Sequence, residues 1–457
     1  MAGMKHNDNL NIDRPWPDPA YAWYVAVVLS LAYMVSFVDR QILTLLVAPI
    51  QADLAISDTQ IGLLQGLAFA VFYCVLGVPI ARLADLRSRR NIILAGIVTW
   101  CVMTALCGAA RGFAQLFVAR IGVGVGEAAL SPPAYSLLAD YFPPERLSRA
   151  TGLYSLGVYA GGGVALLVGA AVIEAIAHMP PIIAPLVGEM RPWQVVFVLV
   201  GLIGLPVALL ITTIREPARR DLAAAAPGIE RADLLAYLRA NLQLLGGMAI
   251  GFSLLGIVII GFISWVPTYL IRVHGWTVGE VGLRYGLVLL VCGSAGAFGG
   301  GWIADVRQAA GTSDAPLRTA FLAGLIALPF AAIGPLLPTG GLALAVIAIA
   351  TLLLSAPVGL AAAALQLSVP NRLRAQVTAI YFLVVALIGT GLGPVIVALA
   401  TDYLFADPRA VGSSLALVAT GLTPAALAAL SLTFAPFRRI RADQAAQRLS
   451  AAIAKSD

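Results

Sequence analysis

The sequence predicts an all-α membrane protein with twelve transmembrane helices in two pseudo-symmetric six-helix bundles. Composition is the first observation behind this prediction: 60% of the 457 residues are hydrophobic and 11% are charged. Soluble domains carry roughly 25% charged residues, so this chain lacks the charge to cover the surface of a soluble enzyme. Its apolar content is also far above that of disordered chains. The other two observations are a series of long uncharged segments and an internal repeat.

Six segments of the first half are long and apolar enough to cross a bilayer. A spanning helix needs about 20 apolar residues, and a helix satisfies its backbone polar groups internally. The fourth segment qualifies although it contains Arg120 and Glu127. The six expected spans are Pro19–Val38, Thr59–Ala81, Asn91–Ala110, Phe113–Tyr141, Ala150–Ile173 and Pro192–Ile214.

The second half predicts six more spans. The uncharged segment Thr319–Asn371 is too long for one helix. It must hold two spans that turn at Pro335–Gly341, because proline and glycine interrupt helices. The other four expected spans are Ala240–Ile271, Tyr285–Ala304, Ala375–Thr401 and Ala410–Phe437.

The distribution of basic residues predicts the orientation of the spans. With the N-terminus inside, four of the 29 basic residues fall in outer loops, three lie within spans, and the other 22 flank the spans on the cytoplasmic side. Such a bias predicts that both termini are cytoplasmic. The composition, rich in arginine and alanine, favours a multi-pass protein of a bacterial inner (plasma) membrane. The outer four are Arg111, Arg191, Arg272 and Arg409, and the three within spans are Arg40, Arg120 and Arg284.

The chain divides into two halves that repeat each other. Ala81–Arg87 matches Gly301–Arg307, and Pro144–Leu147 matches Pro370–Leu373, at the same places relative to the spans. Parallel repeats of this kind occur in one large class of secondary transporters. The expected domains are an N-terminal bundle with a cytoplasmic N-terminus (1–214), a cytoplasmic linker with an amphipathic helix (215–241), and a C-terminal bundle with a cytoplasmic tail (242–457).

Span four carries a polar stripe along one face. Arg120, Glu127, Ser131 and Tyr135 are spaced by seven, four and four residues, which places them on one side of a helix. Charges within a membrane are costly and face a cavity or a partner. Arg120 and Glu127 are too far apart along the helix to pair directly, so each needs a partner such as Asp39 or Arg40. We expect a functional cavity here; the alternative is a static ion pair that holds helices together.

Asp39 and Glu127 are the expected proton-coupling residues. Burial favours the protonated form of a carboxylic acid, whereas a neighbouring arginine favours the ionised form. A conformational change that exchanges these environments would load and release a proton. Asp39 and Arg40 are adjacent, so their side chains diverge on a helix. For Asp39 the alternative is an ion pair that locks span one to span four.

The remaining motifs predict no catalytic residue, cofactor or metal. The three histidines lie in loops or at span ends, no CxxC motif exists, and Gly122–Gly126 is expected to permit close helix packing. Nucleic-acid binding is not expected, because the charges sit in short loops between apolar segments. In the second half, Arg284 and Tyr381 are the candidate cavity residues. For Arg284 the alternative is a place near the outer end of its span, where a long side chain can reach the interface. A charged first half facing an apolar second half would suit a substrate with a polar head and an alkyl tail.

The loop Ala81–Arg90 is similar to the loop signature of the major facilitator superfamily. Asp85, Arg89 and Arg90 match that signature, whereas Ala81, Leu86 and Ser88 depart from it. Within the superfamily, Ser36–Leu43 and Ala119–Tyr135 most resemble the Spinster-like branch of sphingolipid and lysophospholipid transporters. The resemblance implies the major facilitator fold.

This resemblance also implies a gate and a substrate. Asp85 would cap the start of span eleven near Thr378, and Arg89 or Arg90 would pair with Asp140, closing the inner gate. Asp305 would be a weaker counterpart in the second half. The substrate would be an amphipathic lipid, such as a lysophospholipid or a sphingoid lipid, moved by rocking of the halves and coupled to protons. Arg120 would be the headgroup or counter-ion residue, and Arg40 would tune Asp39 and Glu127.

Two competing functions remain open at the level of the sequence. The first is a proton-coupled carrier of small organic anions such as sugar acids, since other branches of the superfamily also have charged spans one and four. The second is a receptor or scaffold that transports nothing, which would not need ionisable groups inside the membrane. An ATP-driven pump is disfavoured because the sequence has no Walker motif. We expect a monomeric transporter, with membrane lipids, protons and the substrate as its partners, and not an enzyme.

Overall fold

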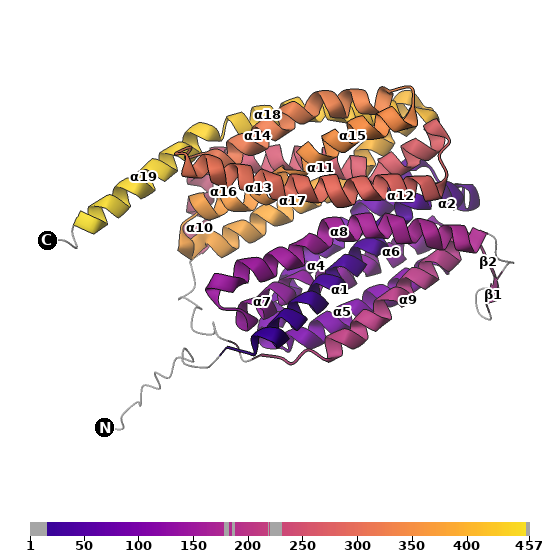
Figure 1. Ribbon diagram of the computed structural model, residues 1–457, viewed down its shortest axis with the longest axis horizontal. Helices are drawn as coiled ribbons and strands as arrows, with labels where there is room; N and C mark the ends of the chain where they lie inside the picture. Colours follow the sequence, from indigo (N-terminus) through magenta and orange to yellow (C-terminus); the bar gives the residue numbers. More distant parts are fainter. Residues whose placement is uncertain (1–15, 178–181, 185–187, 218, 220–230, 454–457) are drawn as a thin grey trace.

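The computed structural model describes residues 16–177, 182–184, 188–217, 219 and 231–453. Its helices run side by side in two groups, one from each half of the chain (Figure 1). Within the described residues, twelve helical segments are long and apolar enough to cross a membrane. The prediction of an all-α membrane protein with twelve spanning helices is therefore confirmed.

The N-terminal bundle contains the first six spans. The second and fourth spans are each built from two consecutive helices, and a short helix, α2 (Val47–Leu54), follows the first span. The spans are α1 (Pro19–Leu45), α3 (Asp58–Gln65) with α4 (Leu67–Leu86), α5 (Arg89–Cys107), α6 (Phe113–Ala128) with α7 (Ser131–Tyr141), α8 (Pro144–Ala177) and α9 (Pro192–Thr212).

The two interruptions fall at a pair of prolines and at a glycine. Between α6 and α7, Pro132 and Pro133 fall in the first turn of α7 and have no N–H to continue the α6 hydrogen bonds. Between α3 and α4, Gly66 lies against the other bundle: a Cβ atom there would be 2.3 Å from the carbonyl oxygen of Gly391. Only glycine permits that approach.

The C-terminal bundle contains the other six spans. A helix of the connecting segment, α10 (Arg231–Ala240), precedes them, and two spans include a π-helical turn. They are α11 (Leu242–His274), α12 (Val278–Val288) with η3 (Leu289–Gly293) and α13 (Ser294–Ala309), α14 (Ala315–Ile333) with η4 (Gly334–Leu336), α15 (Gly340–Ser355) with α16 (Pro357–Ser368), α17 (Asn371–Leu399) with η5 (Ala400–Phe405), and η6 (Pro408–Ala410) with α18 (Val411–Ser431) and α19 (Phe434–Ile453).

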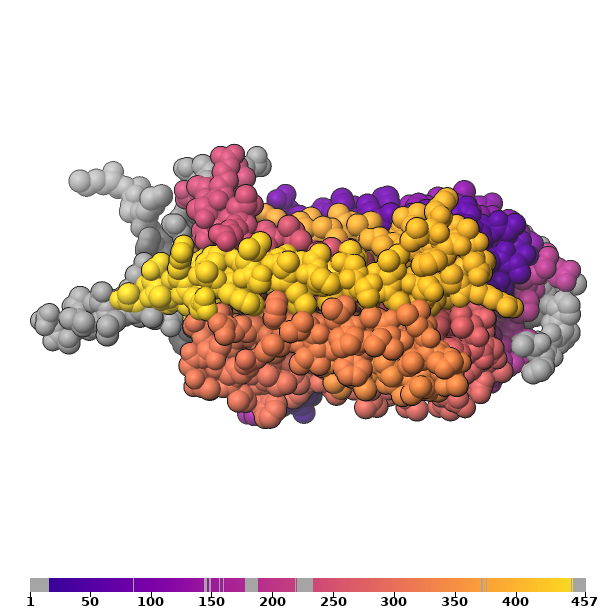
Figure 2. All heavy atoms as spheres, turned by 90° about the horizontal axis from the view of Figure 1, so that it is seen from above, coloured from indigo at the N-terminus to yellow at the C-terminus, as the bar shows by residue number. Residues whose placement is uncertain are grey.

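The two ends of the molecule differ. The start of α1 and the projecting α19 lie at one end, which we call the termini end (Figure 1). At the other, the hairpin end, β1 (Ile182–Ala184) pairs antiparallel with β2 (Gly188–Met190). The sequence did not predict this hairpin. In the space-filling view α18 and α19 (yellow) form a ridge along the C-terminal bundle, and α19 continues past it (Figure 2).

The hydrophobic core shows how the bundles meet. Toward the hairpin end one continuous cluster draws on both bundles, for example Ile42 and Leu166 from the first and Val258 and Val397 from the second. Toward the termini end the core is split: one cluster lies wholly in the N-terminal bundle and another wholly in the C-terminal bundle. The bundles are therefore packed together at the hairpin end and packed separately at the termini end.

Candidate functional site

An ion pair between the first and fourth spans is the centre of the candidate site. Arg40 on α1 donates from Nε and Nη2 to one oxygen, Oε2, of Glu127 on α6, at 2.7 and 2.5 Å. The Glu127 side chain is 1% exposed, whereas that of Arg40 is 20% exposed. Arg40 therefore joins a buried carboxylate to more open space, which makes it the accessible charge of the pair.

Aromatic rings surround the Arg40 guanidinium. Its central carbon lies 4.1 Å from the ring centroid of Phe69, 4.7 Å from that of Phe37 and 5.2 Å from that of Tyr73. The faces of aromatic rings attract a cation, most strongly where water is excluded. The rings and Glu127 together stabilise a positive charge at this position.

Asp39 lies next to Arg40 in sequence but in a different environment. Its side chain is buried, and Oδ1 accepts no hydrogen bond from the described residues. Oε1 of Glu127 is likewise buried without a donor among them. The expected divergence of Asp39 and Arg40 is thus present, and two buried carboxylate oxygens are left unsatisfied, an arrangement that is costly for an ionised group.

Arg120 is buried between helices and does not face open space. Its Nη1 donates to the backbone carbonyl of Asp39 at 3.3 Å, and its Nε donates to that of Leu64 at 3.5 Å. The expectation that Arg120 lines the cavity is wrong for this conformation. The helix periodicity placed Arg120 on the face of Glu127, but the α1 and α3 backbones close over it.

Ser131 and Tyr135 continue the polar face of span four toward the termini end. Ser131 Oγ lies 3.1 Å from the hydroxyl of Tyr154 on α8, and Tyr135 OH lies 3.4 Å from Ser155 Oγ. The rings of Tyr154 and Tyr33 stack with centroids 4.5 Å apart. Tyr135 is 43% exposed, so the aromatic face that begins at Arg40 reaches accessible surface.

Two candidate cavity residues of the second half lie elsewhere. Arg284 is 51% exposed, pairs with Glu280 one helical turn away at 3.4 Å and stacks on Trp276. It is a surface residue near the hairpin end. Tyr381 is buried in the core of the C-terminal bundle, and its hydroxyl donates to the carbonyl of Met248 at 3.3 Å. The placement of Tyr381 contradicts the expectation, because sequence alone does not define the rotation of its helix, whereas Arg284 follows the alternative that it lies exposed near a span end.

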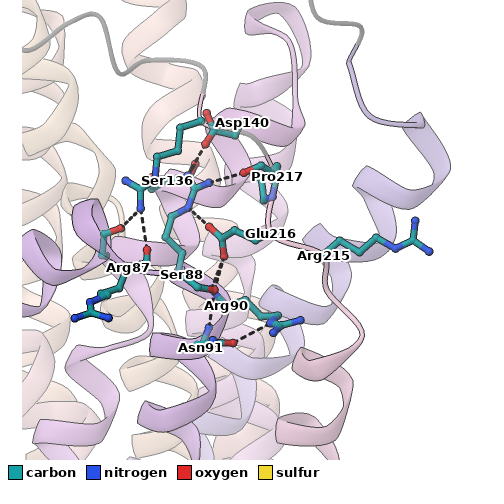
Figure 3. A network of polar contacts seen from close by, with 12 residues as sticks. Arg87, Ser88, Arg90, Asn91, Ser136, Asp140, Arg215, Glu216 and Pro217 are labelled. Carbon is teal, nitrogen blue, oxygen red and sulfur yellow. Dashed lines mark hydrogen bonds and ion pairs between the residues drawn. The ribbon is translucent and has the colours of Figure 1, made fainter. Parts of the chain in front are cut away.

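A polar cluster at the termini end of the N-terminal bundle centres on Arg89. Its Nη1 contacts Asp140 Oδ2 at 2.5 Å and the Ser136 hydroxyl at 2.9 Å, and its Nε contacts Glu216 Oε1 at 2.8 Å (Figure 3). The arginine paired with Asp140 is thus Arg89. Arg90 instead contacts the side chain of Asn91 and the carbonyl of Ile214.

Glu216 was not identified from the sequence. It follows α9 and accepts hydrogen bonds from Ser88 Oγ, the Arg90 backbone N–H and Arg89 (Figure 3). Partial burial alone would raise the pKa of Glu216, but these hydrogen bonds hold the pKa below its ordinary value. Its place in the EPARR motif directly after span six was the available signal.

No gate contact of the other two expected gate residues, Asp85 and Asp305, lies within the described part of the structure. The backbone of Asp85 lies in the last turn of α4, but its side chain lies outside the described part of the structure. Asp305 is exposed and makes no ion pair with the residues that the structure describes. The charged cluster of the C-terminal bundle lies instead at Asp314, which contacts Arg318 at 2.9 Å and Arg438 on α19 at 3.6 Å.

Comparisons with known proteins agree with this geometry. Residues 29–394 match the family model described as Major Facilitator Superfamily. The chain is similar, with a TM-score of 0.74 and 28% identity over 93% of this chain and 98% of the other, to a solved "Bacterial Homolog to Human Lysosomal Transporter, Spinster, in Inward-facing And Unoccupied Conformation". This similarity confirms the resemblance to the Spinster-like branch.

Two curated relatives bear on function. The chain is 28% identical over 435 residues to an "MFS-type efflux pump" of Mycolicibacterium smegmatis, covering 92% of this chain and 94% of that protein. It is 25% identical over 291 residues to a "Hexuronate transporter" of Bacillus subtilis, covering 62% of this chain and 64% of that one. The family match, the twelve spans and the two-bundle fold agree: the chain belongs to the Major Facilitator Superfamily.

Proposed function

We propose that the protein is a secondary active transporter that moves an amphipathic lipid, of the lysophospholipid or sphingoid type, by alternating access coupled to protons. The observation that carries this proposal is the Arg40–Glu127 pair, a buried carboxylate held by a partly exposed cation at 2.5–2.7 Å. Ionisable groups within a membrane are energetically costly, and where they occur they usually mark a functional site. Among the aspartate, glutamate, arginine and lysine residues of the described spans, Arg120 and Glu127 lie farthest from a span end, and both belong to the N-terminal bundle.

The coupling step follows from the geometry of the pair. While Glu127 is ionised, it holds Arg40 within the aromatic rings. A proton on Glu127 removes the charge that binds Arg40, which then becomes available to an anionic headgroup. Conversely, an anion that binds Arg40 leaves Glu127 buried and unpaired, which favours its protonation. Asp39, buried with an unsatisfied oxygen, is the second proton acceptor of this account.

The lipid substrate is supported by the distribution of polarity. From Arg40 toward the termini end, the site is lined by aromatic rings with scattered hydroxyl groups, namely those of Tyr33, Ser131, Tyr135 and Tyr154. In the described spans of the C-terminal bundle, no aspartate, glutamate, arginine or lysine lies as far from a span end as Arg120 or Glu127 of the N-terminal bundle. A molecule with a small polar head and a long apolar tail matches this division of charge.

Alternating access is supported by the way the bundles pack. They share one hydrophobic core at the hairpin end and have separate cores at the termini end. With both termini cytoplasmic, as the basic residues predict, this arrangement corresponds to the state open to the cytoplasm. We place the protein in a bacterial inner membrane as a monomer that needs no cofactor and acts as a transporter rather than an enzyme.

Transport of a small organic anion is the second candidate function. The similarity to a hexuronate transporter over 62% of the chain favours it, as does Arg40, a cation that a sugar carboxylate could reach. This function requires only the polar part of the site. It therefore predicts that soluble carboxylates bind and that a long alkyl tail abolishes binding.

Binding to the purified protein distinguishes the two candidates. We would compare a lysophospholipid panel with a sugar-acid panel at acidic and alkaline pH, using the wild type, Glu127→Gln, and Arg284→Gln as a surface control. Lipid binding that depends on pH in the wild type and control, but not in Glu127→Gln, supports the lipid proposal. Binding of sugar acids alone favours the second candidate. If lipid binding changes neither with pH nor in Glu127→Gln, the coupling role of Glu127 is overturned.

A further inference from the structure

We propose that four residues form a latch that closes the hairpin end between the two bundles: Asp58 and Thr59 on α3, Arg272 on α11 and Asp402 on η5. The latch would have to open whenever the hairpin end opens. This inference rests on the proposed function only in assuming that the bundles alternate between two arrangements. It does not depend on what is transported.

The first contact of the latch is a two-point ion pair. Arg272 donates from Nη1 to Asp58 Oδ2 and from Nη2 to Asp58 Oδ1, both at 2.7 Å. Gln51 on α2 joins the pair: its Oε1 accepts from Arg272 Nη2 at 2.5 Å, and its Nε2 donates to Asp58 Oδ1 at 2.8 Å. Paired hydrogen bonds between a guanidinium and a carboxylate are among the stronger polar contacts in proteins. Asp58 is also almost fully buried.

The second contact involves the next residue of α3, Thr59, and here the carboxylate comes from the opposite bundle. Asp402 Oδ2 accepts from both the backbone N–H and the hydroxyl of Thr59, each at 2.6 Å. Here the carboxylate belongs to the C-terminal bundle and the donors to the N-terminal bundle. Adjacent residues of α3 therefore hold two different helices of the opposite bundle, α11 and η5.

The start of α3 is held rigidly enough to serve both contacts. Ser57 caps the helix, accepting from the N–H of Gln60, while the Gln60 side chain accepts from the N–H of Ser57. This reciprocal cap fixes the first turn of α3 and therefore the direction in which the side chains of Asp58 and Thr59 project from it. Because Asp58 and Thr59 are held in fixed positions on α3, they cannot move with Arg272 and Asp402 when the two bundles separate. Both contacts would therefore break when the hairpin end opens.

The surface below the latch is apolar and close-packed. A Cβ on Gly62 would lie 2.9 Å from the carbonyl of Pro394, and one on Gly163 would lie 2.7 Å from that of Gly286. Dispersion and apolar burial hold such a surface together without directional preference. The latch adds directional, charge-assisted contacts at the rim, where water can hydrate Asp58 and Arg272 once they part. Its strength would therefore help to set the ratio of closed to open molecules.

Distances between spin labels at the hairpin end test the latch. We would replace the four native cysteines and label Ala114→Cys and Leu336→Cys, both exposed and on opposite bundles. The full-length protein in lipid nanodiscs would carry Arg272→Gln, or Thr59→Val as a milder change of nearly equal volume. Arg191→Gln is the matched control, because Arg191 pairs with Asp53 at 3.3 Å within the N-terminal bundle.

We expect Arg272→Gln to increase the ratio of long to short distances about tenfold, as loss of a charge-assisted contact would. Thr59→Val should increase it by a smaller factor, and Arg191→Gln should leave it unchanged. Equal distributions in the wild type and both latch variants would overturn the proposal, as would an equal shift in the control. The measurement needs no substrate, so failure of lipid binding and failure of the latch are separate results.

Discussion

Asp39 and Arg40 are neighbours on α1, yet one is buried with an unsatisfied carboxylate oxygen and the other pairs with Glu127 in partly accessible space. The 100° turn between successive helical residues produces this separation. As a result Asp39 points away from Arg40, whereas Glu127 forms an ion pair with Arg40. Two carboxylates in such different surroundings are suited to binding protons at different steps of a cycle.

The substitution Asp39→Asn should leave the fold intact and impair coupling. Because Oδ1 of Asp39 has no donor among the described residues, removing its charge relieves a desolvation cost and gives up little. We expect a melting temperature equal to or above that of the wild type at neutral pH, together with loss of transport driven by a proton gradient. A large drop in melting temperature would show that Asp39 has a structural partner and contradict this account.

Removal of Arg40 should be more harmful than removal of the whole pair. In Arg40→Met the buried carboxylate of Glu127 loses its cation, which typically costs about 3–5 kcal/mol of folding free energy. The double variant Arg40→Met with Glu127→Gln removes the stranded charge and should recover a large part of that loss. Thermal unfolding of the two single variants and the double variant measures this coupling. Additive losses would mean that the two side chains do not interact.

Glu216 predicts a pH dependence at the termini end. Its pKa is lowered in the folded protein by hydrogen bonds that outweigh partial burial, so its contribution to stability is fully present above the ordinary glutamate pKa of about 4.3. That contribution is lost as pH falls through the lowered value. Wild type should therefore melt above Glu216→Gln at neutral pH, and the difference should shrink under acid. A difference that does not change down to the most acidic pH would argue against this assignment.

Two glycines of the second span form a matched pair for testing bundle contact. A Cβ on Gly66 would meet the Gly391 carbonyl at 2.3 Å, whereas one on Gly77 would meet nothing within 4 Å. Gly66→Ala should lower both melting temperature and transport, because α3 and α17 must move apart. Gly77→Ala should be neutral or stabilising by up to about 1 kcal/mol, the usual difference in helix propensity. Equal behaviour of the two variants would contradict the close approach of the bundles.

The sequence predicted the spans well because hydropathy alone defines them. Arg120 and Glu127 interrupt the fourth span without removing it, and the uncharged segment Thr319–Asn371 does divide between α14 and the α15–α16 pair. The sequence also indicated that Glu127 needs a partner from Asp39 or Arg40, and in the structure Arg40 pairs with it. These predictions rest on local spacing.

The errors concern helix rotation and contacts across the chain. Tyr381 was expected in the cavity, but its helix turns it into a core; for Arg284, of the two positions that the sequence left open, the structure has the exposed one near a span end. Arg120 was expected to line a cavity with a partner such as Asp39 or Arg40, but it is buried and its partners are backbone carbonyls, which no pattern of side chains reveals. The pairs Arg272–Asp58 and Thr59–Asp402 join residues more than 200 positions apart, and only the packing of the two bundles brings them together.

Uptake of a fluorescent lysophospholipid into proteoliposomes, with and without an imposed pH gradient, tests the central claim most directly. Wild type and Glu127→Gln would be reconstituted in parallel, with Arg284→Gln as the surface control. The account predicts that the gradient accelerates lipid movement in the wild type and the control but not in Glu127→Gln. Lipid movement that is indifferent to the gradient in the wild type, or equally stimulated in Glu127→Gln, would contradict it.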